Sequence, residues 1–278
     1  MKQPDQWSRY AERILASGER PHFAPEPETL ALHAREIAGA RALVGPSTHA
    51  LVLGATPELA DLALEQGCRV TRMDCNPAMF DAATKRQRPM SRVGETRVVG
   101  DWLDMPGIAD GSVDLVLGDA SLNNVAHAQM AQLIRQLHRI TRPGSVLSLR
   151  QLTLLDNATT LHPIARTVQR YRAGNLDAHV FGKLLRFCCF IDEVYEGEQR
   201  LLDARRVFQC IERCHREGVM NDAEHAFMRG RRSEIQHTMY RPEQQQAWFA
   251  QLGLCRVEHA CPPSDYRHLF DVWVTRRA

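Results

Sequence analysis

The stretch that most constrains the fold lies between residues 51 and 74, where LVLG is followed by a helical pattern and then by RVTRMD. An apolar run that stops at Gly54 is typical of a buried strand that ends in a tight turn. Apolar residues then recur at helical spacing over Pro57–Gln66, and a second strand pattern, Arg69–Asp74, ends on an acid. Strand, glycine turn, helix, strand and acid together predict a βαβ unit of the kind that binds nucleotides.

The same alternation continues to residue 151 and returns at the end of the chain. Short apolar runs predict seven strands, at Ala50–Leu53, Arg69–Asp74, Thr96–Gly100, Val113–Leu117, Ser145–Arg150, Cys255–Ala260 and Leu269–Thr275. Further helices are expected at Pro77–Lys85, at Ala126–Ile140 and in EQQQAWFAQLG after Pro242. Strands that alternate with helices at this spacing favour a parallel sheet covered on both faces. The expected fold class is α/β, with a Rossmann-like, doubly wound, mostly parallel seven-stranded sheet.

The chain divides into four segments on this interpretation. Residues 1–45 form an N-terminal helical cap, and residues 46–155 form the ligand-binding core. Residues 156–242 have a helical period with both charge signs interleaved, which predicts a helical insertion before the last two strands. Residues 243–278 return to the sheet as a closing helix and two strands. In the cap, Trp7 and Tyr10 lie at helical spacing, where they favour packing on the body but leave open a cover over the ligand.

Composition excludes several classes of function. The 278 residues are 44% hydrophobic and 24% charged, with a net charge of +2, so we expect neither nucleic acid nor a membrane as partner. No apolar run approaches the ~20 residues of a spanning helix. The first twenty residues are charged throughout and lack the apolar centre of a secretory signal, which predicts a cytoplasmic protein.

The eight cysteines are distributed like reduced, core-filling thiols rather than like a disulfide framework. Cys210 and Cys214 would share one helical face, with His215 directly after them. No second pair stands at zinc-ligand spacing, so buried thiols are favoured over a metal site, and no metal ligand is assigned.

The turn after the first strand restricts the ligand. A dinucleotide needs several glycines around its pyrophosphate, whereas this turn supplies Gly54 alone. A sulfonium nucleoside has no phosphate and needs only a tight turn. Asp74 would accept both ribose hydroxyls, Asp101 would take the adenine amino group, and Trp102 would cover the ring. Taken singly, Asp74 could instead cap the helix at Pro77, and Trp102 could belong to the core.

Five motifs in order, LGATPELA, MDCNPAM, VVGDWLDMP, SVDLVLGDASLNNV and RPGSVLSLR, resemble those of the class I S-adenosylmethionine-dependent methyltransferases. The resemblance covers residues 50 to about 151 and implies S-adenosyl-L-methionine as cofactor. By position in the motifs, it implies that the cofactor is bound by Gly54, Ala55, Thr56, Asp74, Cys75, Met79, Gly100, Asp101, Trp102, Asp119, Ala120 and Ser121.

The acceptor is expected to be a small molecule that is methylated on oxygen or nitrogen. The residues Asp119 to Leu122 lack the Asn/Asp-Pro-Pro-aromatic signature of enzymes that methylate nucleic acid bases. The insertion lies where many members of the resembled family cover the acceptor. We expect it to act as an acceptor lid, with aromatic walls drawn from Tyr171, Phe181, Phe187, Phe190 and Tyr195.

Methyl transfer needs alignment of donor and acceptor and, for many acceptors, removal of a proton. The candidate catalytic residues are Asp119 and His127, with His162 and His237 as further candidate bases, while Asn123 and Asn124 either face the acceptor or serve only as turn residues. Two alternatives stay open: an enzyme that transfers or cyclises the aminocarboxypropyl arm of the same cofactor, and a module that binds the cofactor without catalysis. The sequence leaves the oligomeric state undetermined.

Overall fold

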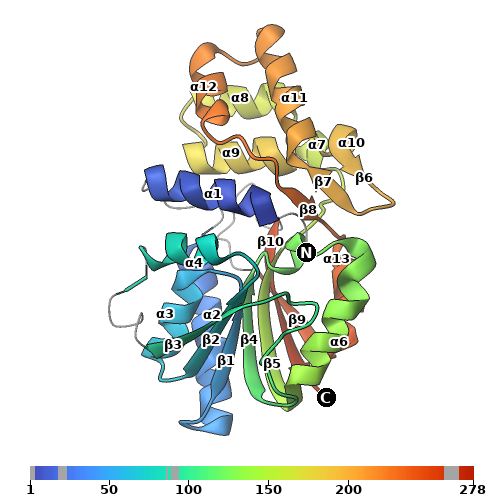
Figure 1. Ribbon diagram of the computed structural model, residues 1–278. Coiled ribbons are helices and arrows are strands. Elements are labelled where there is room, and N and C mark those ends of the chain that lie inside the picture. Colours follow the sequence, from blue (N-terminus) through green and yellow to red (C-terminus); the bar gives the residue numbers. More distant parts are fainter. Residues whose placement is uncertain (1–3, 18–23, 86, 89–93, 260–268) are drawn as a thin grey trace.

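The computed structural model describes residues 4–17, 24–85, 87–88, 94–259 and 269–278. Its centre is a seven-stranded sheet in the order β3-β2-β1-β4-β5-β10-β9 (Figure 1). The strands are β1 (His49–Leu53), β2 (Arg69–Asp74), β3 (Glu95–Val99), β4 (Val113–Asp119), β5 (Thr141–Leu152), β9 (Gly253–His259) and β10 (Phe270–Arg277). Neighbours from β3 to β5 run parallel, and β10 is antiparallel to both β5 and β9. The expected doubly wound, mostly parallel sheet is therefore confirmed.

Helices cover both faces of this sheet, and alternate residues of β1 show how. Ala50 and Val52 pack in one hydrophobic cluster with α2 (Pro27–Val44) and α3 (Pro57–Glu65). Leu51 and Leu53 point to the other face, into a cluster with α6 (Met130–Ile140) and α13 (Pro242–Ala250). A strand buried on both faces needs no alternation of polar and apolar residues, which explains why residues 50–53 (ALVL) form a continuous apolar run.

Most boundaries lie within one or two residues of the expected ones, and two starting residues differ by more. The helix expected from Ala126 begins only at Met130, after the short 3-10 turns η1 (Leu122–Asn124) and η2 (His127–Gln129). Strand β5 begins at Thr141 rather than Ser145, because residues on both sides of Gly144 pair with β4 across an irregularity in register.

The segment between β5 and α13 is an insertion with a hydrophobic cluster of its own. Its helices are α7 (Ala158–Leu161), α8 (Ile164–Arg172), α9 (Ala178–Phe187), α10 (Ile191–Val194), α11 (Ala204–Arg216) and α12 (Asp222–Arg229). A three-stranded sheet that was not expected joins them, formed by β6 (Tyr195–Glu196), β7 (Leu201–Asp203) and β8 (Gln236–Thr238). The insertion lies above the carboxyl edge of the large sheet (Figure 1). Leu152 and Phe270 of the large sheet belong to the same cluster, so the two parts share one core.

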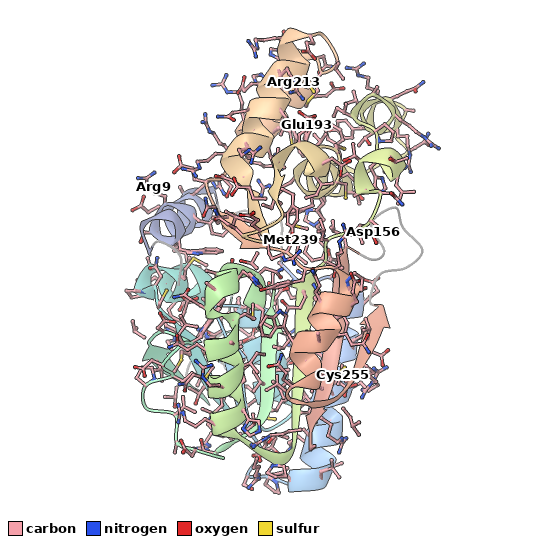
Figure 2. All side chains as sticks on the ribbon, turned by 90° about the vertical axis from the view of Figure 1, so that its right-hand side faces the viewer. Arg9, Asp156, Glu193, Arg213, Met239 and Cys255 are labelled. Carbon is pink, nitrogen blue, oxygen red and sulfur yellow. The ribbon has the colours of Figure 1, made fainter. Side chains whose placement is uncertain are left out.

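Helix α1 (Pro4–Ser17) crosses between the insertion and the large sheet (Figure 1). Asn76, at the start of α4 (Pro77–Thr84), donates from Nδ2 to Ser8 Oγ at 3.0 Å. On the other side, Arg9 pairs with Glu234 of the insertion at 3.1 Å. Figure 2 shows Met239 at the level where the insertion meets the large sheet, with Arg9 on α1 to one side. In the described part of the chain, none of the helices combines the length and apolar character needed to span a bilayer.

Candidate functional site

A cavity with about 1040 Å³ of empty space, part of it open to solvent, lies at the carboxyl ends of β1, β2 and β4. Open α/β sheets place their ligands at this edge, where the strand order reverses. The β1–α3 turn and the ends of β2 and β4 line one part of the cavity. Helix α1 and the insertion line the rest.

The turn after β1 requires glycine. Gly54 has φ +102°, a conformation that side chains with a Cβ rarely adopt. Its amide donates to Met73 O at 2.8 Å, which ties the turn to β2. Ala55 and Thr56 continue along the cavity wall, and Pro57 then begins α3.

Trp102 holds this turn in place through a hydrogen bond and by packing against Gly54. Its indole is 3% exposed, and Nε1 donates to Met73 O at 2.8 Å, the same carbonyl that receives Gly54 N. A Cβ on Gly54 would lie 3.6 Å from the Trp102 ring. The indole lines the cavity and also holds the turn, so its expected cavity role and its core role coexist in one side chain.

Asp74 ends β2 with its carboxylate at the cavity. Oδ1 accepts from Asn76 N at 2.8 Å, and burial raises the pKa of the carboxyl to about 6 although nearby amides lower it. Asn76, not Asp74, caps α4, since its side chain accepts from Ala78 N at 3.0 Å. Asp74 is thus available to a ligand, and a carboxylate there can accept hydrogen bonds from a vicinal diol.

Cys75 and Met79 line an apolar side of the same region, together with Ala82 and Ala83 of α4. Burial raises the pKa of the Cys75 thiol to about 11, and the nearby charges of Asp74 and Asp101 act in the same direction. The thiol is therefore neutral at physiological pH. This wall suits a flat, weakly polar group.

Gly100 and Asp101 do not line the cavity, contrary to expectation. A Cβ on Gly100 would lie 2.6 Å from Pro106 Cγ, so the glycine serves local packing. The Asp101 carboxylate accepts from Leu103 N at 2.9 Å and closes a turn. Asp101 lies beside the site, near enough to influence Cys75, but its contact with a ligand stays a prediction.

The end of β4 brings Asp119, Ala120 and Ser121 to the cavity. Ser121 Oγ donates to Leu53 O at 2.7 Å and joins the ends of β4 and β1. Gly118 permits this approach, because a Cβ there would lie 2.6 Å from Ser121 Oγ. Ala120 is left-handed, with φ +51°, so the chain turns sharply just where it meets the cavity.

Asp119 belongs to a buried network of charges. Arg150 of β5 donates to Asp119 from Nε at 2.5 Å and to Glu26 from Nη1 at 2.8 Å. Glu26 also pairs with Lys183 of α9. Burial raises the pKa of Asp119, whereas Arg150 lowers it. The net effect is a raised pKa, while one carboxylate oxygen is already committed to Arg150, so the role of Asp119 as a base stays a prediction.

The structure separates the candidate histidines. The predicted catalytic position of His127 is wrong, because the residue lies outside the cavity. Its Nδ1 is 2.9 Å from Tyr240 Oη, and its ring lies against Trp248. His162 is buried in the insertion and also lies away from the cavity. His237 of β8 is the candidate imidazole that the described chain brings to the cavity wall.

Of the five aromatic residues singled out, Phe187 lines the cavity and the other four do not. Phe181 stacks on Tyr171 with centroids 4.1 Å apart inside the insertion, and Tyr195 donates to Met239 O at 3.0 Å. Neither Phe181 nor Tyr195 lines the cavity, which corrects the predicted walls. Phe187 does line it, together with Phe270 from β10.

The two asparagines after β4 have different surroundings. Asn123 is buried and bonded on both sides of its amide, to the backbone of Leu152 and to Thr238 O. Asn124 lines the cavity, and its Nδ2 donates to Ala120 O at 3.1 Å. The Asn124 Oδ1 is buried and has no hydrogen-bond partner in the described chain. Asn124 is therefore the one of the pair with an acceptor atom to offer.

Helix α1 places Trp7 and Tyr10 on the cavity, edge to face with centroids 5.6 Å apart. Sequence reasoning favoured packing for this pair, and the structure shows a cover over the cavity. Missed residues include Glu58 and Leu152, which also line it. The pattern RPGSVLSLR also contains a signal that the sequence analysis overlooked. Arg150 ends a predicted buried strand, and a buried arginine needs a carboxylate as its partner.

The described part of the chain contains no group of three or more histidine, cysteine or acidic side chains placed to hold a metal ion. Cys210 and Cys214 are buried thiols on α11, and burial raises the pKa of both. Cys261 lies outside the described residues.

Comparisons with known proteins complete the description of the site. Residues 52–149 match the sequence model of a methyltransferase domain. No curated protein matches the chain in sequence.

Among solved structures, a Rhodobacter sphaeroides protein described as a candidate Zn-dependent alcohol dehydrogenase is similar over 100% of both chains, at 15% identity and TM-score 0.58. The Burkholderia thailandensis 1,6-didemethyltoxoflavin-N1-methyltransferase is similar over 100% of this chain and 92% of its own, at 13% identity and TM-score 0.52. A SAM-dependent methyltransferase from Methanosarcina mazei is similar over 85% and 95%, at 14% identity and TM-score 0.50. At these identities the three structures show a shared fold.

Proposed function

We propose that this chain, whose residues 52–149 form a class I S-adenosylmethionine-dependent methyltransferase domain, methylates an oxygen or nitrogen of a small-molecule acceptor. The observation that carries the proposal is the two-ended cavity. We define one end by Gly54 and Asp74, which lie side by side, and the other by Phe187 with His237 and Phe270, whose rings lie next to that of Phe187.

The residues at the first end fit S-adenosylmethionine, the cofactor of this domain class. The half-buried Asp74 carboxylate would accept the ribose hydroxyls, and the neutral wall of Cys75 and Met79 would pack on the adenine. The turn at Gly54 and the end of β4 at Asp119 would hold the amino-acid part. When bound, the cofactor supplies an activated methyl group.

The second end would orient the acceptor. Phe187 and Phe270 would pack on its apolar surface, and the free Oδ1 of Asn124 would accept an N–H or O–H. In this proposal His237 takes the proton that the acceptor loses. Its ring lies edge to face with Phe187, with centroids 5.8 Å apart, so it is held at the cavity wall.

The segments that cover the cavity favour a small acceptor over a polymer. Trp7 and Tyr10 close it from α1, while α9 and β8 close it from the insertion. A base in a nucleic acid polymer needs an open approach and a basic surface, whereas the net charge here is +2. We propose, on the same grounds, that the protein has no nucleic acid or membrane partner.

The test is a product assay with a panel of metabolite-sized amines, phenols and carboxylic acids. Methylation adds one methyl group to the acceptor and releases S-adenosylhomocysteine, whereas aminocarboxypropyl transfer gives a different mass. His237→Gln should lower kcat by about 100-fold or more and leave S-adenosylhomocysteine binding unchanged. His127→Gln, outside the cavity, is the control. Failure to bind S-adenosylhomocysteine, or no methylated product from any member of the panel, would contradict the proposal.

A further inference from the structure

The side chain of Asn123 joins three segments of the chain that are far apart in sequence. Its Nδ2 donates to Leu152 O at 2.9 Å and to Thr238 O at 2.7 Å, and its Oδ1 accepts from Leu152 N at 2.9 Å. Asn123 belongs to the turn after β4, whereas Leu152 ends β5 and Thr238 ends β8 of the insertion. One buried amide thus connects the large sheet with the sheet of the insertion.

These contacts fix which way the Asn123 amide faces. Its nitrogen has two hydrogens to donate, and backbone carbonyls accept both, while its oxygen accepts the backbone N–H of Leu152. A rotation of the amide by half a turn would place its oxygen against two carbonyl oxygens. An ionised aspartate would have no hydrogen to donate to either carbonyl, so the surroundings favour the amide.

Each segment that Asn123 joins also contributes to the wall of the main cavity. The turn after β4 contributes Asn124, β5 contributes Leu152, and β8 contributes His237. Asn123 itself is buried behind this wall and does not line the cavity. His237 directly precedes Thr238, whose carbonyl accepts from Asn123. The amide therefore acts one residue away from the imidazole that takes the proton in the proposed function.

A second hydrogen bond ties β8 to the same turn. The buried Thr238 donates from Oγ1 to Val125 O at 2.6 Å, directly after the 3-10 turn that contains Asn123. Strand β8 has three residues and lies at the edge of the small sheet, where it pairs with β7. Because its sheet supports so short a strand on one side only, the position of His237 depends on these bonds to the turn after β4.

We infer that Asn123 is a positioning residue for methyl transfer, which acts through Thr238 and sets the place of the His237 imidazole relative to the acceptor. This inference rests on the proposed function and adds a residue to it. Misplacement of a reacting group by about 1 Å can lower the rate of catalysis about 100-fold, so a bond behind the wall has a measurable effect on turnover.

The test measures kcat of Asn123→Ala in the wild type and in the His237→Gln background, with an acceptor found by the product assay. Loss of the amide should lower kcat about tenfold or more in the wild type, but less than about threefold where the imidazole is already absent. Binding of S-adenosylhomocysteine should be unchanged in both. Equal effects in the two backgrounds would overturn the inference, because a merely structural role does not depend on His237.

Thr238→Val is a milder variant that keeps the test decisive if Asn123→Ala does not fold. It removes the bond to Val125 O and should lower kcat in the same non-additive way, whereas Thr238→Ser keeps a hydroxyl and should stay within about threefold of wild type. Thr48→Val is the matched control. Thr48 is also buried and donates from Oγ1 to Gly45 O at 2.7 Å, but it lies before β1, outside the cavity, so its loss should leave kcat unchanged.

Nuclear magnetic resonance of protein with isotope-labelled histidine separates this inference from the proposed function. The imidazole signal of His237, identified as the one that His237→Gln removes, should move in Asn123→Ala and in Thr238→Val and stay in place in Thr48→Val. The signal of His33, buried on α2, is the internal reference. An unmoved His237 signal in both variants would overturn the inference whether or not an acceptor is methylated. A moved signal without any methylated product would contradict the proposed function alone.

Discussion

Replacing Asp74 with asparagine should reveal the cost of keeping an ionised carboxylate at the end of β2. Burial raises the pKa of Asp74 from 3.8 to about 6, and that difference corresponds to about 3 kcal/mol. The folded protein holds the proton more tightly than the unfolded chain does. The contribution of Asp74 to stability is therefore fully present below about pH 4 and is lost as the pH rises through about 6. The asparagine of the variant does not titrate and lacks this dependence.

The measurement is urea unfolding of the wild-type protein and Asp74→Asn at several values between pH 4 and pH 8. The free energy of unfolding of the variant, relative to wild type, should rise by about 3 kcal/mol across that range. The variant has one acceptor oxygen where the carboxylate has two, so it also loses part of the hydrogen bonding to the backbone of Asn76, Ala55 and Cys75, but that loss does not change with pH. The slope, rather than the absolute difference, is thus the quantity to compare. Asp104→Asn, at an exposed carboxyl nearby, is the control.

The same residue should make cofactor binding depend on pH. If the Asp74 carboxylate accepts the ribose hydroxyls, a protonated Asp74 must lose its proton before S-adenosylhomocysteine binds. The affinity for S-adenosylhomocysteine should therefore fall up to about tenfold per pH unit below 6. Asp74→Asn should bind about 1–3 kcal/mol more weakly at pH 7.5 and show a flat profile. Parallel profiles for wild type and variant, in unfolding and in binding, would refute the reasoning about this carboxyl.

Three further predictions concern the walls of the site. Gly54→Ala should lower the free energy of unfolding by about 1–3 kcal/mol, because φ is +102° there; urea unfolding tests it, and unchanged stability would show that the turn relaxes. Arg150→Met should cost about 3–5 kcal/mol by the same assay, since it removes the guanidinium that pairs with both Asp119 and Glu26, and a cost below 1 kcal/mol would contradict the network. Trp7→Ala should weaken S-adenosylhomocysteine binding several-fold in calorimetry, unlike the exposed Glu12→Ala on the same helix; equal effects would argue against a cover.

The large sheet could be predicted because its signals are local. Each strand is a short apolar run next to a helical pattern, and the runs that give β1 and β2 sit within one or two residues of their expected positions. The three strands of the insertion gave no such signal. Tyr195–Glu196 is two residues long, and Leu201–Asp203 is three, too short for a period to be visible.

The candidate site could be predicted only where a residue's position in the chain fixes its place at the sheet edge. Asp74 and Asp119 end strands, so the topology brings them together. Asp101 follows a strand in the same way, but its carboxylate is used by the local turn at Leu103. Nothing near His237 in sequence marks it among twelve histidines, because its place comes from the packing of β8 against distant segments.

The rotation of α9 about its axis explains why Phe181 was wrongly predicted to line the cavity. Phe181 and Phe187 both lie on α9, and six residues advance an α-helix by about 1.7 turns, so the two rings point about a third of a turn apart. Phe181 meets Tyr171 inside the insertion, and Phe187 meets the cavity. Which of two aromatic residues faces a ligand depends on the rotation of the helix about its axis. The sequence of α9 alone does not determine that rotation.

The buried charges connect the seating of α9 with the cofactor end of the cavity. Glu26 receives Arg150 from the large sheet and Lys183 from α9, and both cations lie over the ring of Phe270, at 4.7 Å and 5.2 Å from its centre. Arg150 also holds Asp119, where β4 meets the cavity. A shift of α9 would therefore leave a charge buried without its partner, which costs several kcal/mol. The insertion is held in one position relative to the methyl donor, and alignment of this kind is what methyl transfer requires of a protein.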